Sequence, residues 1–292
     1  MDAPHVDGCP DTYLVDNALF GTPNLLATYL LDAADPAILD AGTVAGAERI
    51  LDAMDTVGID PAAVETLLVS HVHLDHAAGT ARLLAACENA TVVVHERGLS
   101  YLTDAERLDR LVESVEAAIG MEAPYGDPEL VPEDRCRAVS GGEVLDLGDR
   151  ELELYDAPGH APHHYVALEP DSGTLFGADA VGAFDPRSDT VAPTTPPPSF
   201  DLEANLDTVD RLLDLEPSRT LYSHFGPGER GEATAELHAY AEILPEFVET
   251  VERVRAETDD DLDAMLDALR PEWESPTLRR DVVGVCRYLD TQ

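Results

Sequence analysis

Lysine is absent from this chain. All 18 of its basic residues are arginine, against 59 aspartates and glutamates, and the formal net charge is −41 at pH 7. This excess disfavours nucleic acid as a partner, because phosphates would meet a surface of their own sign. It predicts an acidic, halophilic surface, since concentrated salt screens self-repulsion beyond about 3 Å at 1 M. A disordered acidic chain is the alternative, but an apolar content of 44% argues against it.

Long apolar runs and paired cysteines are also missing. No window approaches the roughly 20 apolar residues of a membrane span. The amino-terminal stretch MDAPHVDGCPD has neither the basic nor the apolar region of a secretory signal. No CxxC pair occurs among the four cysteines, Cys9, Cys87, Cys136 and Cys286. We therefore expect a cytoplasmic protein without a membrane partner and without a cysteine-based zinc site.

The order of the segments predicts an α/β fold, because strands and helices alternate over the first hundred residues. We expect two strands within 25–40, a helix over 41–58, strands at 65–70 and 91–96, and helices from about His76 to Cys87 and over 99–120. Hairpins follow at 141–160 and 165–179, then a proline-rich stretch at 186–200 without regular structure, a helix from Asp201 and a strand ending at His224. The remainder reads as helices, which predicts a catalytic domain over 1–228 and a helical extension over 229–292.

Residues 70–79, SHVHLDHAAG, concentrate polar side chains directly after an apolar strand. Within six residues lie four potential metal ligands, His71, His73, Asp75 and His76. Imidazole and carboxylate are donors that zinc accepts, and α/β folds place ligand groups where a strand meets a helix. One such pair in a loop would be an ordinary solvated pair, whereas the pattern His-x-His-x-Asp-His favours a metal site.

Three isolated residues, His160, Asp179 and His224, also stand at the ends of predicted strands. Each alone is a weak signal, because a lone histidine is more often an ordinary packed or exposed residue. Two divalent ions need roughly eight protein contacts when one carboxylate is shared. Together with the first cluster, the three residues complete such a set.

In this order, the motifs HVHLDH, APGH, GAD and SHFG resemble the metal motifs of the metallo-β-lactamase-fold hydrolases, over residues of about 12 to 226. The resemblance implies a four-layer αβ/βα sandwich, with two mixed sheets face to face, helices outside and metals at one edge. It implies a first ion at His71, His73 and His160, a second at Asp75, His76 and His224, and Asp179 bridging both. Asp40, in ILDAG, would orient a ligand histidine.

The complete second set favours the two-metal branch, similar to glyoxalase II-type thioesterases and lactonases. VVVHERG, APGHAPHHY and APTTPPPSF resemble a set of stand-alone archaeal members. The helical tail resembles the substrate-covering helices of the thioesterase-type members.

These resemblances imply two divalent ions, zinc first, with iron or manganese as alternatives. A hydroxide bridging them would attack a small thioester or ester, and Asp75 would orient it by accepting its hydrogen bond.

A phosphodiesterase or nuclease is one alternative to this hydrolase, disfavoured by the missing basic patch. A mononuclear-iron sulfur dioxygenase is another, disfavoured by the complete second set. A binding module with vestigial motifs is a third alternative, but it would lack some of the seven candidate ligands. We expect a small-molecule substrate and no nucleic acid, and leave a homodimer open.

Other candidates receive lesser roles. His163 and His164 are expected to support the site or pack beside it rather than contact substrate, and His95 is expected to be structural. Residues 193–198, PTTPPP, are predicted with equal weight to wall the site or to be a plain connector. Arg97 is a candidate for a substrate carboxylate, without further support.

Overall fold

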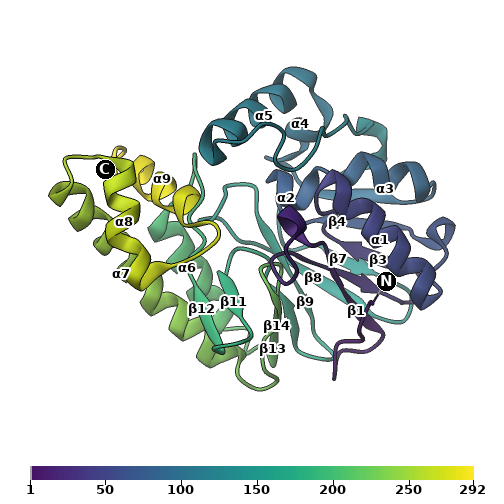
Figure 1. Ribbon diagram of the computed structural model, residues 1–292. Coiled ribbons are helices and arrows are strands. Elements are labelled where there is room, and N and C mark those ends of the chain that lie inside the picture. The colour runs from purple at the N-terminus through teal and green to yellow at the C-terminus, as the bar shows by residue number, and fades with distance from the viewer. Residues whose placement is uncertain (1) are drawn as a thin grey trace.

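The computed structural model describes residues 2–292, which form two six-stranded mixed sheets packed face to face (Figure 1). The first sheet has the sequential order β1 (Thr12–Asp16), β2 (Ala27–Leu31), β3 (Ala37–Leu39), β4 (Thr66–Val69), β5 (Thr91–His95) and β6 (Cys136–Val139). Strands β3 to β6 are parallel, whereas β1 and β2 are antiparallel to their neighbours. The outer strands β1 and β6 were not among those predicted.

The second sheet has the order β14-β13-β10-β9-β8-β7. Its strands are β7 (Val144–Asp146), β8 (Glu151–Asp156), β9 (Tyr165–Glu169), β10 (Thr174–Phe176), β13 (Arg219–Tyr222) and β14 (Gly226–Pro227). Strand β10 is parallel to β13, and β9 is antiparallel to both β8 and β10. The strands β8, β10 and β13 therefore run in the same direction, and their carboxyl ends lie at one edge of the sheet.

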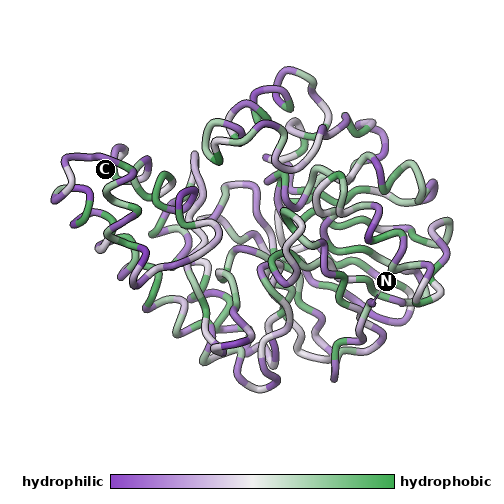
Figure 2. The backbone as a smooth tube through the Cα atoms, viewed as in Figure 1, coloured by the Kyte–Doolittle hydropathy of each residue, from purple (hydrophilic) through white to green (hydrophobic). Residues whose placement is uncertain are grey.

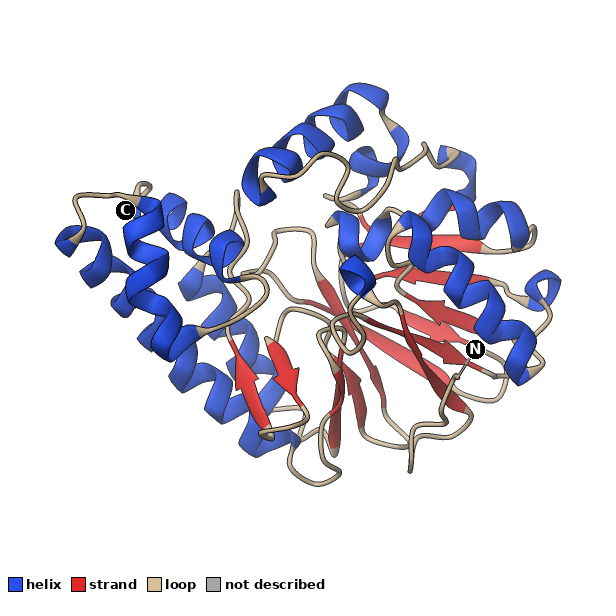
Figure 3. Ribbon diagram, viewed as in Figure 1, coloured by secondary structure: helices blue, strands red, loops and turns tan. Residues whose placement is uncertain are grey.

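Helices cover the outer faces of both sheets (Figure 3). The helices of the described residues are α1 (Val44–Val57), α2 (Leu74–Ala77), α3 (Thr80–Ala86), α4 (Leu99–Thr103), α5 (Ala105–Ile119), α6 (Leu202–Leu213), α7 (Ala233–Glu257), α8 (Leu262–Trp273) and α9 (Leu278–Leu289). Short 3-10 turns occur at Leu19–Gly21, Pro61–Ala63 and Glu133–Arg135, and a small hairpin joins β11 (Ala183–Asp185) to β12 (Thr190–Ala192). The expected αβ/βα sandwich with C-terminal helices is confirmed.

Buried apolar clusters fill the spaces between the layers. Strand β4 contributes to two of them: Leu67 faces the cluster under α1 and α3, and Leu68 faces the cluster between the sheets. Alternate residues of a strand point to opposite faces, so a strand buried on both faces needs an uninterrupted apolar run. In Figure 2 the strands are mainly hydrophobic, whereas the helices alternate between hydrophilic and hydrophobic residues along their length.

Three sequence predictions need correction. The helix expected from His76 is broken at Gly79, whose backbone N–H donates to the carbonyl of Gly42 at 3.0 Å instead of to the preceding turn. The helix expected over 99–120 divides at Asp104, whose side chain caps α5. The stretch 186–200 is not wholly irregular, because it contains β12. The residues of β12 precede the run of prolines, so their backbone donors remain available for pairing with β11.

The C-terminal helices share a buried apolar cluster with β9, β10 and β13. Within the cluster, α7 packs on α6 and β12, and Trp273 contacts Phe247 at a ring-centroid distance of 5.0 Å. Helix α9 packs against α5 as well as against α7 and α8. In residues 2–292, no helix combines the length and the apolarity that crossing a membrane requires.

Candidate metal centre

The carboxyl-terminal ends of β4, β8, β10 and β13 converge at one edge of the sandwich. All seven predicted ligand residues lie there, namely His71, His73, Asp75, His76, His160, Asp179 and His224. His71 and His73 follow β4 directly, and the next two lie in the first turn of α2. The sheets meet at this edge through a backbone hydrogen bond from Tyr165 to the carbonyl of Ser70, 3.0 Å long.

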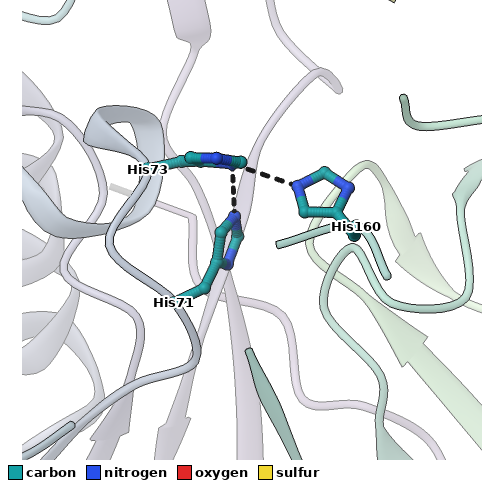
Figure 4. A group of neighbouring side chains, drawn as sticks. All are labelled: His71, His73 and His160. Atoms are coloured by element: carbon teal, nitrogen blue, oxygen red, sulfur yellow. Dashed lines mark hydrogen bonds between the residues drawn. The ribbon is translucent and has the colours of Figure 1, made fainter. Parts of the chain in front are cut away.

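The first group consists of His71, His73 and His160 (Figure 4). The Nδ1 atom of His73 lies 2.9 Å from Nε2 of His71 and 3.1 Å from Nε2 of His160. Two nitrogens bound tetrahedrally at the zinc–nitrogen distance would be about 3.3 Å apart. The spacing of the three rings therefore suits one ion.

The second group consists of Asp75, His76 and His224, with Asp179 between the two groups. The Nε2 atom of His224 lies 3.6 Å from an oxygen of Asp75 and 3.6 Å from Oδ2 of Asp179. Asp179 Oδ2 is also 3.4 Å from Nε2 of His160, and Asp179 Oδ1 is 3.5 Å from Nε2 of His76. One carboxylate thus faces both groups.

Hydrogen bonds on the outer side of the rings direct the ligand lone pairs inward. The Nδ1–H groups of His160 and His224 donate to the carbonyls of Thr194 and Leu25, at 3.1 and 2.6 Å. His76 Nδ1 donates to a carboxylate oxygen of Asp40, at 3.0 Å. When Nδ1 carries the proton in this way, Nε2 of a neutral imidazole is a free lone pair, which is the form that binds a metal.

Several of these inward atoms have no hydrogen-bond partner in residues 2–292. They are the Nε2 atoms of His76 and His224 and both carboxylate oxygens of Asp179, all buried. Leaving such a buried group unpaired costs about 1–3 kcal/mol, and more when it is charged. Metal coordination would satisfy all four atoms at once, so the residues fit a pair of cations.

The electrostatics of the site separate its histidines into two kinds. Burial, reinforced by neighbouring histidines, holds the pKa of His71 and His73 well below 6.5, so both are neutral. Burial opposes protonation of His76 as well, but the carboxylates of Asp179 and Asp75 raise its pKa well above 6.5. Burial would raise the pKa of Asp179, yet the surrounding histidines hold it well below its usual range. Binding of cations at this site would therefore release protons from its side chains.

A family model, the Metallo-beta-lactamase superfamily, matches residues 23–224. This chain belongs to the metallo-beta-lactamase superfamily. The match covers all seven residues of the two groups and stops at His224, so α7, α8 and α9 lie outside the part that the superfamily model describes.

Among sequence relatives, the metallo-beta-lactamase fold-containing protein ST1585 of Sulfurisphaera tokodaii is 33% identical over 165 residues, 56% of this chain. This match spans 61% of the length of ST1585, which is less than two thirds. An N-acyl homoserine lactonase of Bacillus thuringiensis is 23% identical, over 69% of this chain and 68% of its own length. A hydroxyacylglutathione hydrolase of Hyphomonas neptunium is 27% identical, over 54% and 58%.

Solved structures of the superfamily show the same fold. ST1585 from Sulfolobus tokodaii superimposes with a TM-score of 0.67 at 24% identity, covering 80% of this chain and 86% of its own. The protein TTHA1429 from Thermus thermophilus superimposes with a TM-score of 0.71 at 21% identity, covering 97% and 94%. The latter coverage includes the region of the C-terminal helices.

Asp40 positions ligand histidines of the centre through hydrogen bonds, as the sequence suggested for this superfamily member. It follows β3 in a left-handed conformation, with φ of 66°. One carboxylate oxygen accepts from the backbone N–H of Ser70 at 2.8 Å, and the other from the hydroxyls of Ser70 and Ser223 and from His76. The Ser70 oxygen also lies 3.1 Å from Nδ1 of His71. Asp40 therefore orients a histidine of each group.

Changing Asp40→Asn is expected to weaken metal binding about 10- to 100-fold, because the amide that replaces Oδ2 would oppose the N–H of His76. Competition with a chelator, followed by metal analysis, measures this change. The control is Asp32→Asn, an exposed residue of the turn before β3. Equal metal affinity in both variants would contradict the role of Asp40.

Other histidines surround the centre. His164 Nε2 accepts from the backbone N–H of Asp179 at 3.3 Å, and His163 Nδ1 accepts from that of Val72 at 3.4 Å. His164 thus holds the backbone of Asp179, whereas His163 also lines the adjoining cavity. His95 is bound to Asp156 at 3.0 Å, in agreement with a structural role.

A cavity of about 310 Å³ adjoins the centre, ending at His73 and Asp75. Pro196, Pro197 and Pro198 line it, which favours the wall over the plain connector for the stretch 193–198. Arg97 does not line the cavity and instead donates to the carbonyl of Pro162. Two other lining residues, Tyr125 and Arg280, carry no signal in the sequence, because each lies far along the chain from every metal motif.

Proposed function

We propose that this hydrolase holds two divalent ions and cleaves a small thioester or ester. The supporting observation is Asp179, whose two unpartnered oxygens face the first and second groups of ligands. His71, His73 and His160 would hold one ion and Asp75, His76 and His224 the other. The chain's membership in the superfamily supports hydrolysis as the reaction class.

Zinc suits the donor set best. The side chains supply imidazole nitrogen and carboxylate oxygen, and the second group is as complete as the first. Iron and manganese accept the same donors, so they remain alternatives. A mononuclear iron centre would leave the buried atoms of the second group without partners, which argues against the dioxygenase.

Bound ions supply Lewis acidity, which polarises an acyl carbonyl and lowers the pKa of water from about 15.7 towards about 7. The chain itself positions the reactants. Asp75 stands at the end of the cavity, where a carboxylate oxygen would accept a hydrogen bond from the attacking water and orient it. Pro196, Pro197 and Pro198, together with the apolar face of α5, limit bulk water around the substrate.

The choice of an acyl substrate is supported by two relatives. One is named an N-acyl homoserine lactonase and the other a hydroxyacylglutathione hydrolase, and both names describe cleavage at an acyl carbon. The net charge of −41 opposes a nucleic-acid substrate. These observations favour an ester or thioester over a phosphodiester.

A screen at high salt tests this function. Zinc-loaded protein is expected to cleave a member of a panel of thioesters, aryl esters and lactones, and chelator-treated protein is expected to cleave none. The panel should also contain a β-lactam and bis-(4-nitrophenyl) phosphate. Turnover of the phosphodiester alone would replace this proposal by a phosphodiesterase.

We also propose that the chain works in the concentrated salt of a halophilic cytoplasm, on the strength of its charge and its lack of lysine. Its melting temperature is expected to rise between about 0.1 M and about 3 M KCl, as screening shortens the Debye length. Calorimetric scans at several KCl concentrations measure this. A melting temperature that stays constant or falls would contradict it.

A further inference from the structure

The cavity beside the metal centre is lined in part by a residue from outside the superfamily match. Its inner end is formed by His73 and Asp75, and the other lining residues come from α4, α5, the proline stretch, the segments around Tyr125 and His163, and α9. The residue that α9 contributes is Arg280. The C-terminal extension thus takes part in the site as well as covering the second sheet.

Arg280 is buried with one donor group unused. Its side chain is 11% exposed, Nη1 donates to Asp75 Oδ2 at 3.3 Å, and Nε donates to Asp281 Oδ1 at 3.4 Å. Its Nη2 has no partner among residues 2–292. A guanidinium carries five N–H groups and no acceptor, so the Nη2 group can form a hydrogen bond only with an acceptor atom of another group. By hydrogen-bond geometry, no described residue accepts from Nη2, and Tyr125 is the neighbouring side chain whose hydroxyl interacts with the guanidinium.

The position of Arg280 is fixed by the contacts of its neighbour. Asp281 accepts hydrogen bonds from the backbone N–H of Thr195 at 3.2 Å and from the hydroxyl of Thr277 at 2.6 Å, and its carbonyl accepts from the hydroxyl of Thr195. One turn later, a Cβ atom on Gly284 would lie 1.8 Å from the carbonyl oxygen of Thr195. Helix α9 is therefore pressed against the proline stretch, and the guanidinium is held ready for a ligand.

The cavity is locally cationic in a strongly acidic protein. Arg107 and Arg110 line it together with Arg280, and Asp75 is the one acidic residue in the lining within residues 2–292. Arg107 lies over the ring of Tyr101, and Arg110 is 3.9 Å from Glu106. Deeper inside, Asp75 would be committed to an ion, which leaves Asp281 as the counter-charge of Arg280.

Part of the cavity lining is apolar. Leu111, Val115, Ala118 and Ile119 of α5 contribute to it, together with the three prolines. A ligand that matches both parts has a short apolar chain and an anionic end. Tyr125 also lines the cavity and its hydroxyl interacts with Arg280, so the two neighbouring side chains can both donate to one carboxylate that enters here.

We propose that Arg280 is a specificity-determining residue that binds a carboxylate of the substrate. The substrate class is then an ester or thioester that carries a free carboxylate on a short apolar chain. This inference rests on the proposed function, because it identifies the substrate class of the same site. It assigns recognition to the C-terminal extension, while the αβ/βα sandwich supplies the metal ligands.

Two esters with the same six-carbon acyl chain test it, the mono-4-nitrophenyl ester of adipic acid and 4-nitrophenyl hexanoate. With zinc-loaded protein, kcat/KM for the adipate ester is expected to be at least about tenfold higher. Arg280→Met is expected to raise KM for the adipate ester about tenfold more than for the hexanoate ester, and Arg280→Lys is expected to restore part of the difference. The matched control is Arg279→Met, an exposed arginine that pairs with Asp263.

A binding measurement separates this inference from the proposed function. Titration calorimetry is expected to detect hexanoate, but not hexanamide, on zinc-loaded protein, and to show weaker binding by Arg280→Met. If hexanoate binds in this way while neither ester is cleaved, the carboxylate subsite stands and the ester hydrolase does not. If both esters are cleaved with equal kcat/KM, or if Arg280→Met affects them equally, the role of Arg280 in recognition is wrong.

Discussion

Replacing Asp179 by alanine is expected to lower the metal content from about two ions per chain to one or none and to reduce hydrolysis by about 10³-fold or more. Asp179 faces His76, His160 and His224, so its loss removes a donor from each group. The Lewis-acid contribution of a bound ion is several kcal/mol, and about 4 kcal/mol corresponds to 10³ in rate.

Metal analysis after gel filtration and steady-state kinetics on the active ester measure the two effects. The matched control is Asp171→Ala, an exposed carboxylate in the turn between β9 and β10. It is expected to keep both ions and full activity. Retention of two ions in Asp179→Ala would exclude the bridging role.

Removing the metal from the wild-type protein is expected to abolish hydrolysis and to lower the melting temperature. Without cations, the Nε2 atoms of His76 and His224 and the oxygens of Asp179 remain buried and unpaired. Ligands that bind only the folded state stabilise it by mass action, so their removal destabilises it. Adding back two equivalents of zinc is expected to restore both properties.

Metal analysis of protein purified without added metal, followed by chelation and titration with zinc, checks this prediction. Magnesium, which prefers oxygen ligands, serves as the control ion and is expected to restore neither property. A stoichiometry of one iron per chain, with oxygen uptake in place of hydrolysis, would favour the dioxygenase alternative. Full activity after complete chelation would exclude a role for metal.

Much of the fold could be predicted because its signals are local. The apolar run at 66–69, the helix that ends at Gly58 and the N-cap Asp201 are each encoded within a few neighbouring residues. The break at Gly79 was missed because the N–H of this residue donates to the carbonyl of Gly42 instead of continuing the helix, a contact formed only after folding. Strand β6 was missed because its residues are largely exposed or half-buried and show no clear alternation.

The candidate metal residues could be predicted because metal chemistry restricts which side chains serve, and because four of them lie within six residues. Their assembly depends on β8, β10 and β13 ending at the same edge as β4, which follows from the strand order of two sheets. That order was implied by the resemblance to the superfamily and not by any single segment.

The sequence by itself therefore determined the identity of the seven ligand candidates, the strand-to-helix junction that carries four of them and the acidic character of the surface. The tertiary structure alone decided which side chains from outside the metal motifs lie beside these ligand candidates. Arg280 contacts Asp75 across 205 residues of sequence. No periodicity or motif specifies such a pair, since it exists only because three helices, packed on one another and on the second sheet, bring α9 to the cavity.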